Sequence, residues 1–391
     1  MSDTDATDGH GELARLVALG SATTRADLAR LTGLSRSTVS HRVEALLAGG
    51  VLVEGGEPVP SSGGRRGTRL RLDGSAGLLL TADLGATAAR LAVSDLNGVE
   101  LAASTEDHDI DQDPEPVLRR VVERFAELLA GRDAERVRAV VVGLPAPVEF
   151  GLGHAVKPPL MPATWHRHPV ADHFADRFPR AEVLIDNDTN LMALGEHRET
   201  YPGLRHLLYV KVGTGIGCGV VVGGELYRGA GGAAGDIGHI RLGHDETPCR
   251  CGNTGCLEVV AGGKALAARL RAQGRDAPDA RAVVRLAEAG DVVARSEVRA
   301  AARRIGEVLA AVISFANPEA IVLGGSLARL DQALLAGIRA VLFERAFPLS
   351  THTLRTEVGA LGDRAGTVGA VTLAQRHLLS DRGIGALLGS R

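Results

Sequence analysis

The stretch HLLYVKVGTGIGCGVVVGGELYRG, residues 206–229, decides the fold class of this chain. It predicts two β-strands that are separated by a glycine-rich turn at residues 213–217. The strand AEVLIDNDTN, residues 181–190, precedes it and leads into a predicted helix that opens at LMALGE. The strand EAIVLGGS, residues 319–326, follows and also ends in a pair of glycines. Strands that alternate with helices predict an α/β domain.

Three predicted strands run into a turn that contains glycine. One such turn is weak evidence for a binding site, because glycine at the end of a strand is usually only a turn residue. Three of them in this order favour loops whose backbone N–H groups bind the phosphates or the adenosine of a nucleotide. The candidate nucleotide-binding residues, which apply only if the protein transfers phosphate from a nucleotide, are Gly85, Thr87, Gly213, Thr214, Gly215, Gly324 and Gly325.

Length and composition exclude several classes of protein. The 391 residues predict two or three domains, and 45% hydrophobic residues exclude a disordered chain. Aromatic residues make up only 3%, which argues against base stacking on single-stranded nucleic acid as the main activity. No apolar run reaches the roughly 18 residues of a membrane helix, and the acidic start MSDTDATDGH lacks the regions of a signal peptide. We therefore expect a cytoplasmic protein that has no membrane partner.

The first 75 residues predict a small winged helix-turn-helix domain. Thr24 and Asp27 have the spacing of a capping box at the start of one helix, and Gly33 ends that helix. Ser35 caps the next helix, SRSTVSHRVEALLAGG, whose apolar side chains share one face. The strands VLVE and TRLRL then flank a loop rich in Gly, Ser and Pro, which predicts a β-hairpin wing.

The helix that follows Ser35 carries hydroxyl and cationic side chains close to its N-terminus. That end of a recognition helix enters the major groove, where Arg reads guanine and Ser or Thr contacts bases or phosphate. The net charge of the chain is -3, but residues 36–71 contain more Arg than Glu, so any DNA contact is local. The alternative is a three-helix module that binds protein or caps the core. The candidate DNA-binding residues are Ser35, Arg36, Ser37, Thr38, Ser40, His41, Arg42, Arg65 and Arg66.

The larger part of the chain resembles a known family. The resemblance covers residues 78 to about 375 and depends on the motifs DLGAT (83–87), LPAPVEF (144–150), IDNDTN (185–190), VGTGIGCGVVVGGELYRG (212–229), GAAGDIGHI (232–240) and CRCGNTGCLE (249–258). In this order they resemble the ROK family of repressors, open reading frames and kinases. The resemblance implies a two-lobed actin/hexokinase-like (ribonuclease H-like) fold, a sugar cleft between the lobes, and homodimers or homotetramers.

Three of the four cysteines are grouped near a histidine. Three thiols and one imidazole in one loop-rich stretch suit a tetrahedral structural Zn²⁺ better than a disulfide in a cytosolic protein. His244 competes as the nitrogen ligand, and the resemblance favours His239. Cys218 lies in a different glycine turn, which argues against an iron–sulfur cluster, and free thiols are the remaining alternative. The candidate metal ligands are His239, Cys249, Cys251 and Cys256.

The resemblance also implies a sugar site, because its motifs supply acceptors and donors for a ring of hydroxyls. The implied sugar-binding residues are Asn187, Asp188, Asp236, His239 and Glu258. Asp188 matches the catalytic base of the kinases, whereas Asn187 and Asp188 taken alone also suit a helix cap. Asp236 is one methylene shorter than the Glu that is commoner in the kinases. Trp165, in a loop (154–169) expected over the cleft mouth, either packs against sugar or anchors the core.

Two functions are compatible with this sequence. The first is a sugar-responsive transcriptional regulator, a repressor of carbohydrate metabolism genes, whose affinity for double-stranded operator DNA changes when a sugar or sugar phosphate binds. The second is an ATP- and Mg²⁺-dependent sugar kinase that carries a DNA-binding head. Ala86 and Ala88 stand where the kinases usually have Gly and Lys, and Ala146 interrupts the family's Pro-Gly-Pro. These changes predict weakened ATP binding and favour the regulator.

The expected domain organisation follows from these assignments. Residues 1–75 form the winged helix-turn-helix domain. Residues 76–195 form lobe I, to which a C-terminal helix at 373–391 is added. Residues 196–372 form lobe II, with the zinc loop and the surface for a second copy.

Overall fold

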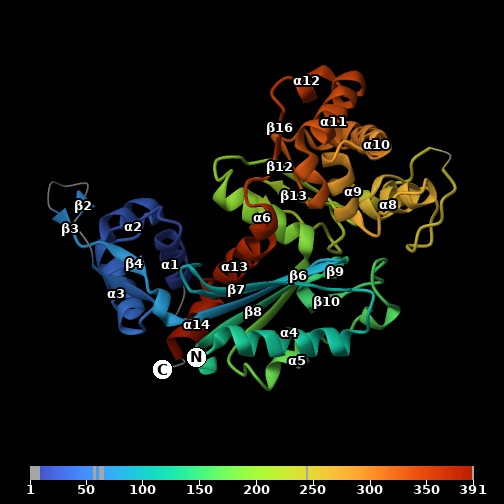
Figure 1. Ribbon diagram of the computed structural model, residues 1–391. Helices are drawn as coiled ribbons and strands as arrows, with labels where there is room; N and C mark the ends of the chain where they lie inside the picture. Colours follow the sequence, from blue (N-terminus) through green and yellow to red (C-terminus); the bar gives the residue numbers. More distant parts are fainter. Residues whose placement is uncertain (1–8, 56–58, 61–65, 244, 390–391) are drawn as a thin grey trace.

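The computed structural model describes residues 9–55, 59–60, 66–243 and 245–389, which form a small head and two larger lobes (Figure 1). Within these ranges no helix is both long enough and apolar enough to cross a membrane. His244, the competing nitrogen ligand, and Arg65 lie outside the described residues.

The head is a winged helix-turn-helix, as the sequence predicted. Thr24 and Asp27 form both hydrogen bonds of a capping box, and Gly33 ends the helix with a left-handed backbone (φ 71°). The wing strands β1 and β4 pair antiparallel, as do the short strands β2 and β3. The elements of the head are α1 (His10–Ala18), α2 (Arg25–Thr32), α3 (Arg36–Ala48), β1 (Leu52–Glu54), β2 (Val59–Pro60), β3 (Arg66–Gly67) and β4 (Leu70–Leu72).

Lobe I is a five-stranded sheet of order β11-β8-β5-β6-β7. Strand β5 pairs parallel with β8 and antiparallel with β6. The helix α4 packs against β6 and β7, and the small pair β9–β10 lies beside β11 (Figure 1). Its elements are β5 (Leu78–Leu84), β6 (Ala88–Asp95), β7 (Glu100–Asp107), α4 (Pro114–Leu129), β8 (Val137–Leu144), β9 (Val148–Glu149), β10 (His154–Ala155), α5 (Asp172–Ala175) and β11 (Glu182–Asn187).

Lobe II repeats this sheet with the order β14-β13-β12-β15-β16. In both sheets the first strand is central, the next two continue antiparallel on one side, and the fourth and fifth add parallel on the other. This duplication confirms the expected two-lobed actin/hexokinase-like fold. Its elements are β12 (Leu207–Val212), β13 (Ile216–Val222), β14 (Glu225–Leu226), α7 (Leu257–Ala261), α8 (Gly263–Ala272), α9 (Ala280–Glu288), α10 (Val292–Ala316), β15 (Ala320–Gly324), α11 (Asp331–Arg345), α12 (Pro348–Thr351) and β16 (Arg355–Val358).

Two helices pack against each other between the lobes, α6 (Asp188–Glu199) and α13 (Ala365–Leu378) (Figure 1). Their backbones touch, because a Cβ at Gly369 would lie 1.7 Å from the carbonyl oxygen of Leu191. A single helix over 373–391 was expected, but the chain forms α13 and then α14 (Asp381–Gly389). The Ser380 hydroxyl accepts the Gly383 N–H at 3.1 Å and caps the start of the second helix.

One hydrophobic core joins the head to the rest of the protein. It contains Leu13 and Leu46 of the head, Leu79 of lobe I, and Leu378 and Ile384 of the C-terminal helices, all nearly or fully buried. Because these side chains form one contiguous cluster, the head is packed onto lobe I through α13 and α14.

Candidate functional site

The first two turns of α3 face outward from the head. The Ser35 side chain accepts the Thr38 N–H at 3.1 Å, which satisfies one of the free amides of the first turn. Its hydroxyl is also 2.8 Å from the hydroxyls of Ser37 and Thr38. Val39, Val43 and Leu46 are buried on the opposite face. Arg36, Ser37 and His41 are therefore exposed, while Thr38 and Ser40 are half-buried.

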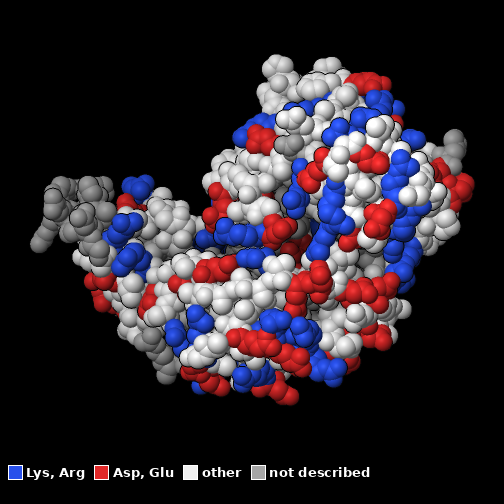
Figure 2. All heavy atoms as spheres, in the orientation of Figure 1, with Lys and Arg blue, Asp and Glu red and all other residues white. Residues whose placement is uncertain are grey.

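The remaining basic candidates of the head do not all lie on this outward face. The guanidinium of Arg42 lies against Gly9, just before α1, on the flank of α3. Arg66 begins the wing strand β3, where it pairs with Pro60. Arg69 and Arg71, which were not among the candidates, are exposed on the other wing strand or just before it. Lys and Arg side chains are visible on the head in Figure 2.

Arg25 organises the head and was not predicted from the sequence. Its guanidinium donates to Glu44 of α3 at 2.7 Å and also forms an ion pair with Glu54 of β1. Arg25 therefore connects the first helix of the motif to the recognition helix and to the wing. It also neutralises two carboxylates close to the outward face, which favours the approach of a polyanion.

A cleft of about 620 Å³ lies between the two lobes, and all five predicted sugar-binding residues line it. Asn187 and Asp188 stand where β11 ends and α6 begins, and Glu258 is on α7. Asp236 and His239 belong to the short turn that contains the GDIGH motif. The cleft is hollowed between the lobes in Figure 2, where both acidic and basic side chains border it.

Asp188 is almost completely buried and forms an ion pair with Lys211 of β12. Its other carboxylate oxygen accepts the Thr189 hydroxyl at 3.0 Å. Burial would lower the pKa of Lys211, but the carboxylates of Asp188 and Asp83 outweigh it and raise that pKa. Burial raises the pKa of Asp83 itself to about 7. The Asp188 carboxylate is therefore engaged by a cation of the protein, which no sequence motif indicated.

Asn187 fulfils the helix-cap role that the sequence offered as an alternative. Its side-chain oxygen accepts the N–H groups of Thr189 and Asn190 at 2.9 and 3.1 Å. Its amide nitrogen donates to the Ala146 carbonyl at 3.0 Å. Next to it, the buried Asp186 pairs with Arg228. These contacts fix the end of β11, so the side chains that line the cleft are held rigidly.

Glu258 lines the cleft, and its carboxylate lies against Gly215, which has no side chain. A Cβ at Gly215 would lie 2.1 Å from the Glu258 carboxylate. The same carboxylate accepts the Ile216 N–H at 3.3 Å, and burial raises the pKa of Glu258 despite the nearby imidazole of His239. The position of the Glu258 carboxylate therefore depends on the glycine turn at residues 213–217.

Six of the seven predicted nucleotide-binding residues line the same cleft, namely Gly85, Thr87, Gly213, Thr214, Gly215 and Gly325. Gly324 does not, because it ends β15 and faces the Tyr209 hydroxyl, where a Cβ would overlap at 1.7 Å. Ala86 and Ala88 also line the cleft, so methyl groups stand in the first turn. Trp165 is fully buried, and its indole N–H donates to the Gln112 carbonyl at 2.8 Å, so it anchors the core of lobe I.

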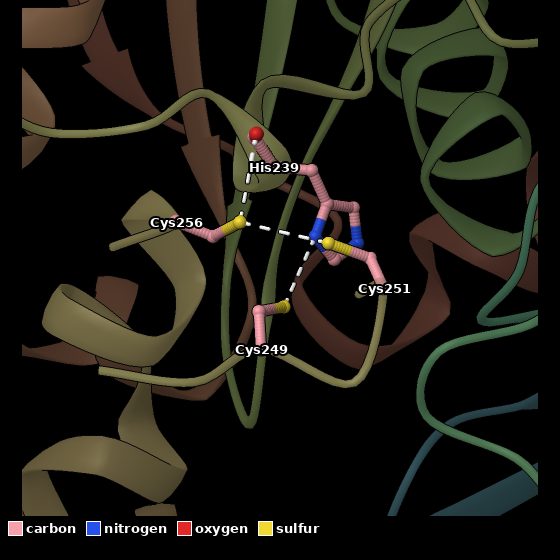
Figure 3. Close-up of side chains that lie close together, drawn as sticks. All are labelled: His239, Cys249, Cys251 and Cys256. Carbon is pink, nitrogen blue, oxygen red and sulfur yellow. Dashed lines mark hydrogen bonds between the residues drawn. The ribbon is translucent and has the colours of Figure 1, made fainter. Parts of the chain in front are cut away.

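The four predicted metal ligands converge on one point (Figure 3). Their ligand atoms all lie within 4.8 Å of one another. The His239 Nδ1 is 3.5 Å from the Cys249 sulfur, and the sulfurs of Cys251 and Cys256 are 3.6 Å apart. Three sulfurs and one imidazole nitrogen at this spacing fit a four-coordinate metal ion. The other ring nitrogen of His239 lies 3.9 Å from Asp236, on the side of the cleft.

Arg250 connects this cluster to the opposite lobe. It lies between two of the cysteines and forms an ion pair of 2.9 Å with Asp111, which follows β7 of lobe I. Arg281 of α9 forms a second ion pair of 2.9 Å, with Asp107 at the end of β7. Two contacts thus cross the cleft between the lobes.

A winged helix-turn-helix head on a duplicated two-lobed domain with a polar cleft defines a class of sugar-binding regulators and kinases. Comparison with known proteins agrees with this class. The model of the ROK family matches residues 79–377, and a winged helix-turn-helix DNA-binding model matches residues 20–53. The chain belongs to the ROK family.

Individual relatives extend the comparison. The xylose repressor of Caldicellulosiruptor bescii is 27% identical over 91% of this chain and 92% of its own length. The glucokinase of Thermotoga maritima is 28% identical over 77% of this chain and 98% of its own. A solved ROK family transcriptional regulator, a homologue of the E. coli Mlc protein, has the same fold over 99% of this chain and 100% of that chain (TM-score 0.83, 23% identity). A ROK family glucokinase from Streptomyces griseus, solved with glucose and AMPPNP, aligns with 76% of this chain and 99% of that chain (TM-score 0.67, 29% identity).

Proposed function

We propose that this protein is a sugar-responsive transcriptional repressor of carbohydrate metabolism genes, which binds operator DNA in the cytoplasm. The observation that carries the proposal is that the head and the cleft share structural elements. The helix α6 begins at Asp188 in the cleft and packs on α13, which leads directly into α14 under the head. A sugar that moves the lobes therefore moves the surface on which the head is seated.

The contact between α14 and the head is close and specific. The Asp381 carboxylate accepts the N–H groups of Gly9 and Gly11 at 3.1 and 3.0 Å and so caps α1. A Cβ at Gly49, just after the recognition helix, would lie 2.1 Å from the Leu388 side chain of α14. Since α14 contacts both α1 and the end of α3, a small rotation of α14 reorients the recognition helix.

In this proposal the cleft binds the effector through Asn187, Asp188, Asp236, His239 and Glu258. A sugar that leaves these groups without hydrogen-bond partners is rejected, because unpaired buried polar groups are costly. The names of the relatives make D-xylose and D-glucose the first sugars to test. DNA is contacted by the outward residues of α3, and the wing adds phosphate contacts through Arg65 and Arg66.

We propose Zn²⁺ as the metal held by His239 and the three clustered cysteines. Its role is structural, because all four positions are filled by protein ligands and no open position remains for a substrate. A metal on Nδ1 of His239 fixes the other ring nitrogen toward the cleft, and it fixes Arg250 toward Asp111 in lobe I. Metal loss should therefore weaken the response to sugar more than the binding of DNA.

We propose that the functional units are 1–75, 76–195 together with 373–391, and 196–372, and that two copies associate through the last of these. Lobe II exposes large apolar side chains at the ends of α10 and α11 and around α12. They are Phe315 (94% exposed), Phe343 (67%), Phe347 (66%) and Leu349 (73%). Exposed apolar patches are typical of interaction sites. A homodimer would present two heads to two operator half-sites, with a homotetramer as the alternative.

A sugar kinase is the second candidate, and Asp188 in a cleft with an intact second glycine turn favours it. Phosphoryl transfer needs a free base, held phosphates and a metal. Here Lys211 engages Asp188, and Ala86 and Ala88 occupy the first turn. The test is release of ADP from ATP in the presence of D-glucose or D-xylose, with Asp188→Asn as the control. A rate that depends on both the sugar and Asp188 would establish the kinase.

The regulator is tested by titrating the full-length protein into labelled DNA from upstream of its own gene, at one fixed salt concentration, because phosphate contacts make the affinity depend on salt. We expect that it binds this DNA more tightly than scrambled DNA, and that one sugar of the panel changes this affinity. Ser37→Ala with His41→Ala should weaken the binding to this DNA, whereas Arg382→Ala on the exposed side of α14 should not. Equal affinity for both DNAs would refute the proposal.

A further inference from the structure

We propose a second metal site, on the outer side of lobe I, formed by His168, His173 and Glu115. Among the described residues, this is the one other group of three or more metal-ligating side chains whose ligand atoms lie within 4.8 Å of one another. It is separate from the cysteine cluster in the sequence and in its ligand chemistry, since it has two imidazoles, one carboxylate and no sulfur.

The geometry of the two imidazoles points to a shared cation. The Nε2 atoms of His168 and His173 are 2.7 Å apart, and the ring centroids are 5.0 Å apart. The Glu115 carboxylate lies 3.7 Å from the Nε2 of His173 and 4.0 Å from that of His168. At 2.7 Å the two nitrogens share one proton, because two N–H groups cannot face each other at this distance. A divalent cation would replace this proton and release it to solvent.

Small movements suffice to complete the site. In a tetrahedral site with metal–nitrogen bonds of about 2.0–2.1 Å, two nitrogens are separated by roughly 3.3 Å. The imidazoles therefore need to separate by only about half an ångström.

Neighbouring contacts hold the three ligands in place. The Trp165 indole donates to the Gln112 carbonyl at 2.8 Å, and the Thr164 hydroxyl donates to Asp113 at 2.7 Å. These bonds fasten the segment before His168 to the start of α4, where Glu115 is located, and α4 packs against α5, which carries His173 (Figure 1). Such preorganisation by neighbouring bonds is what a metal site requires.

The donor set defines the metal and its coordination. Imidazole with carboxylate suits Zn²⁺, Co²⁺ or Ni²⁺ rather than Ca²⁺ or Mg²⁺, which prefer all-oxygen sites. Three protein ligands leave at least one position for water. The loop 154–169, which carries His168, also contributes Pro159 and Leu160 to the wall of the cleft. A metal that joins this loop to α4 and α5 would therefore stiffen one side of the cleft.

The test is a Co²⁺ titration of the full-length, chelator-treated protein, followed by absorption spectroscopy and calorimetry. We expect two Co²⁺ per chain. One gives the intense sulfur-to-cobalt charge-transfer band of the cysteine cluster, and the second adds weak d–d absorption without changing that band. His173→Ala and Glu115→Gln should each lower the affinity for the second Co²⁺ by at least about a hundredfold and leave the first unchanged. Loss of even an outer partner of a metal ligand lowers metal affinity by about 10- to 100-fold.

His166→Ala is the matched control, because His166 is exposed in the same loop but is not part of the group, and it should keep both ions. The charge-transfer band reports folding in every variant. If His173→Ala fails to fold, Glu115→Gln decides, since its side chain is 73% exposed. Binding of one Co²⁺ only, or a second Co²⁺ whose affinity is unchanged in the folded variants, would overturn the proposal.

Discussion

Gly369→Ala should separate the two helices that connect the cleft to the head. The Cβ of the alanine would lie 1.7 Å from the carbonyl oxygen of Leu191 and 3.0 Å from the amide nitrogen of Gly195. A normal contact requires α13 to move away from α6 by more than roughly 1 Å, since both partners are backbone atoms of a helix. Overpacking of this kind costs about 1–3 kcal/mol. At about 2–4 °C per kcal/mol, the melting temperature should fall by about 2–12 °C.

The functional consequence is measured by fluorescence anisotropy with operator DNA, with and without the effector sugar. Coupled sites typically change each other's affinity by about 5- to 150-fold, and this factor should fall toward 1 in the variant. Gly203→Ala is the control, because a Cβ there would meet no atom within 4 Å. A Gly369→Ala protein that has the lowered melting temperature but keeps the sugar response of the wild type would show that the α6–α13 contact does not transmit the signal.

Three further predictions concern other parts of the molecule. The folded state raises the pKa of Asp83 to about 7, so the protein holds a proton there that the unfolded chain has lost, and stability falls as the pH rises from about 4 to 7. Asp83→Asn has no titrating group at this position, so it should not lose stability over this pH range. Measured by urea unfolding, the free energy of unfolding of the variant minus that of the wild type should therefore rise by up to about 3 kcal/mol between pH 5 and pH 8. A difference that stays the same at all pH values would contradict the raised pKa of Asp83. Cys249→Ser should lose the tightly bound zinc and weaken the response to sugar, whereas Cys218→Ala, at a buried cysteine outside the cluster, should keep both. The zinc content is measured by elemental analysis. Zinc that is retained in Cys249→Ser would exclude the proposed ligand set. Asp381→Ala removes the acceptor of two amide groups at the start of α1. It should lower the free energy of unfolding by about 0.5–2 kcal/mol and reduce the response to sugar, whereas Arg382→Ala should do neither. Equal urea midpoints for the two variants would show that this cap does not stabilise the protein.

Local signals in the sequence were sufficient for the elements of the head and for the glycine turns. The capping box of Thr24 and Asp27 and the cap at Ser35 are formed as predicted, because they depend on residues three apart in the chain. The cysteine cluster was also predictable, since its four ligands lie within one loop of 18 residues between His239 and Cys256.

Contacts between distant segments could not be predicted in this way. The pairing of Lys211 with Asp188 depends on how β12 is placed against the start of α6, and the pairing of Arg250 with Asp111 depends on the closure of the two lobes. The Arg42 side chain points toward Gly9, just before α1, and this contact depends on how α1 packs beside α3. The sequence alone is compatible with Trp165 either against a sugar or in the core. The packing of lobe I buries it fully and pairs its indole N–H with the Gln112 carbonyl, so it belongs to the core.

The measurement that tests the central claim most directly is the affinity of the full-length protein for its effector sugar, determined by calorimetry with and without saturating operator DNA. If cleft and head are coupled, DNA must change the affinity for sugar by the same factor by which sugar changes the affinity for DNA, since linkage is reciprocal. The account predicts that these two factors are equal and differ clearly from 1. A sugar affinity that is the same with and without operator DNA would contradict it.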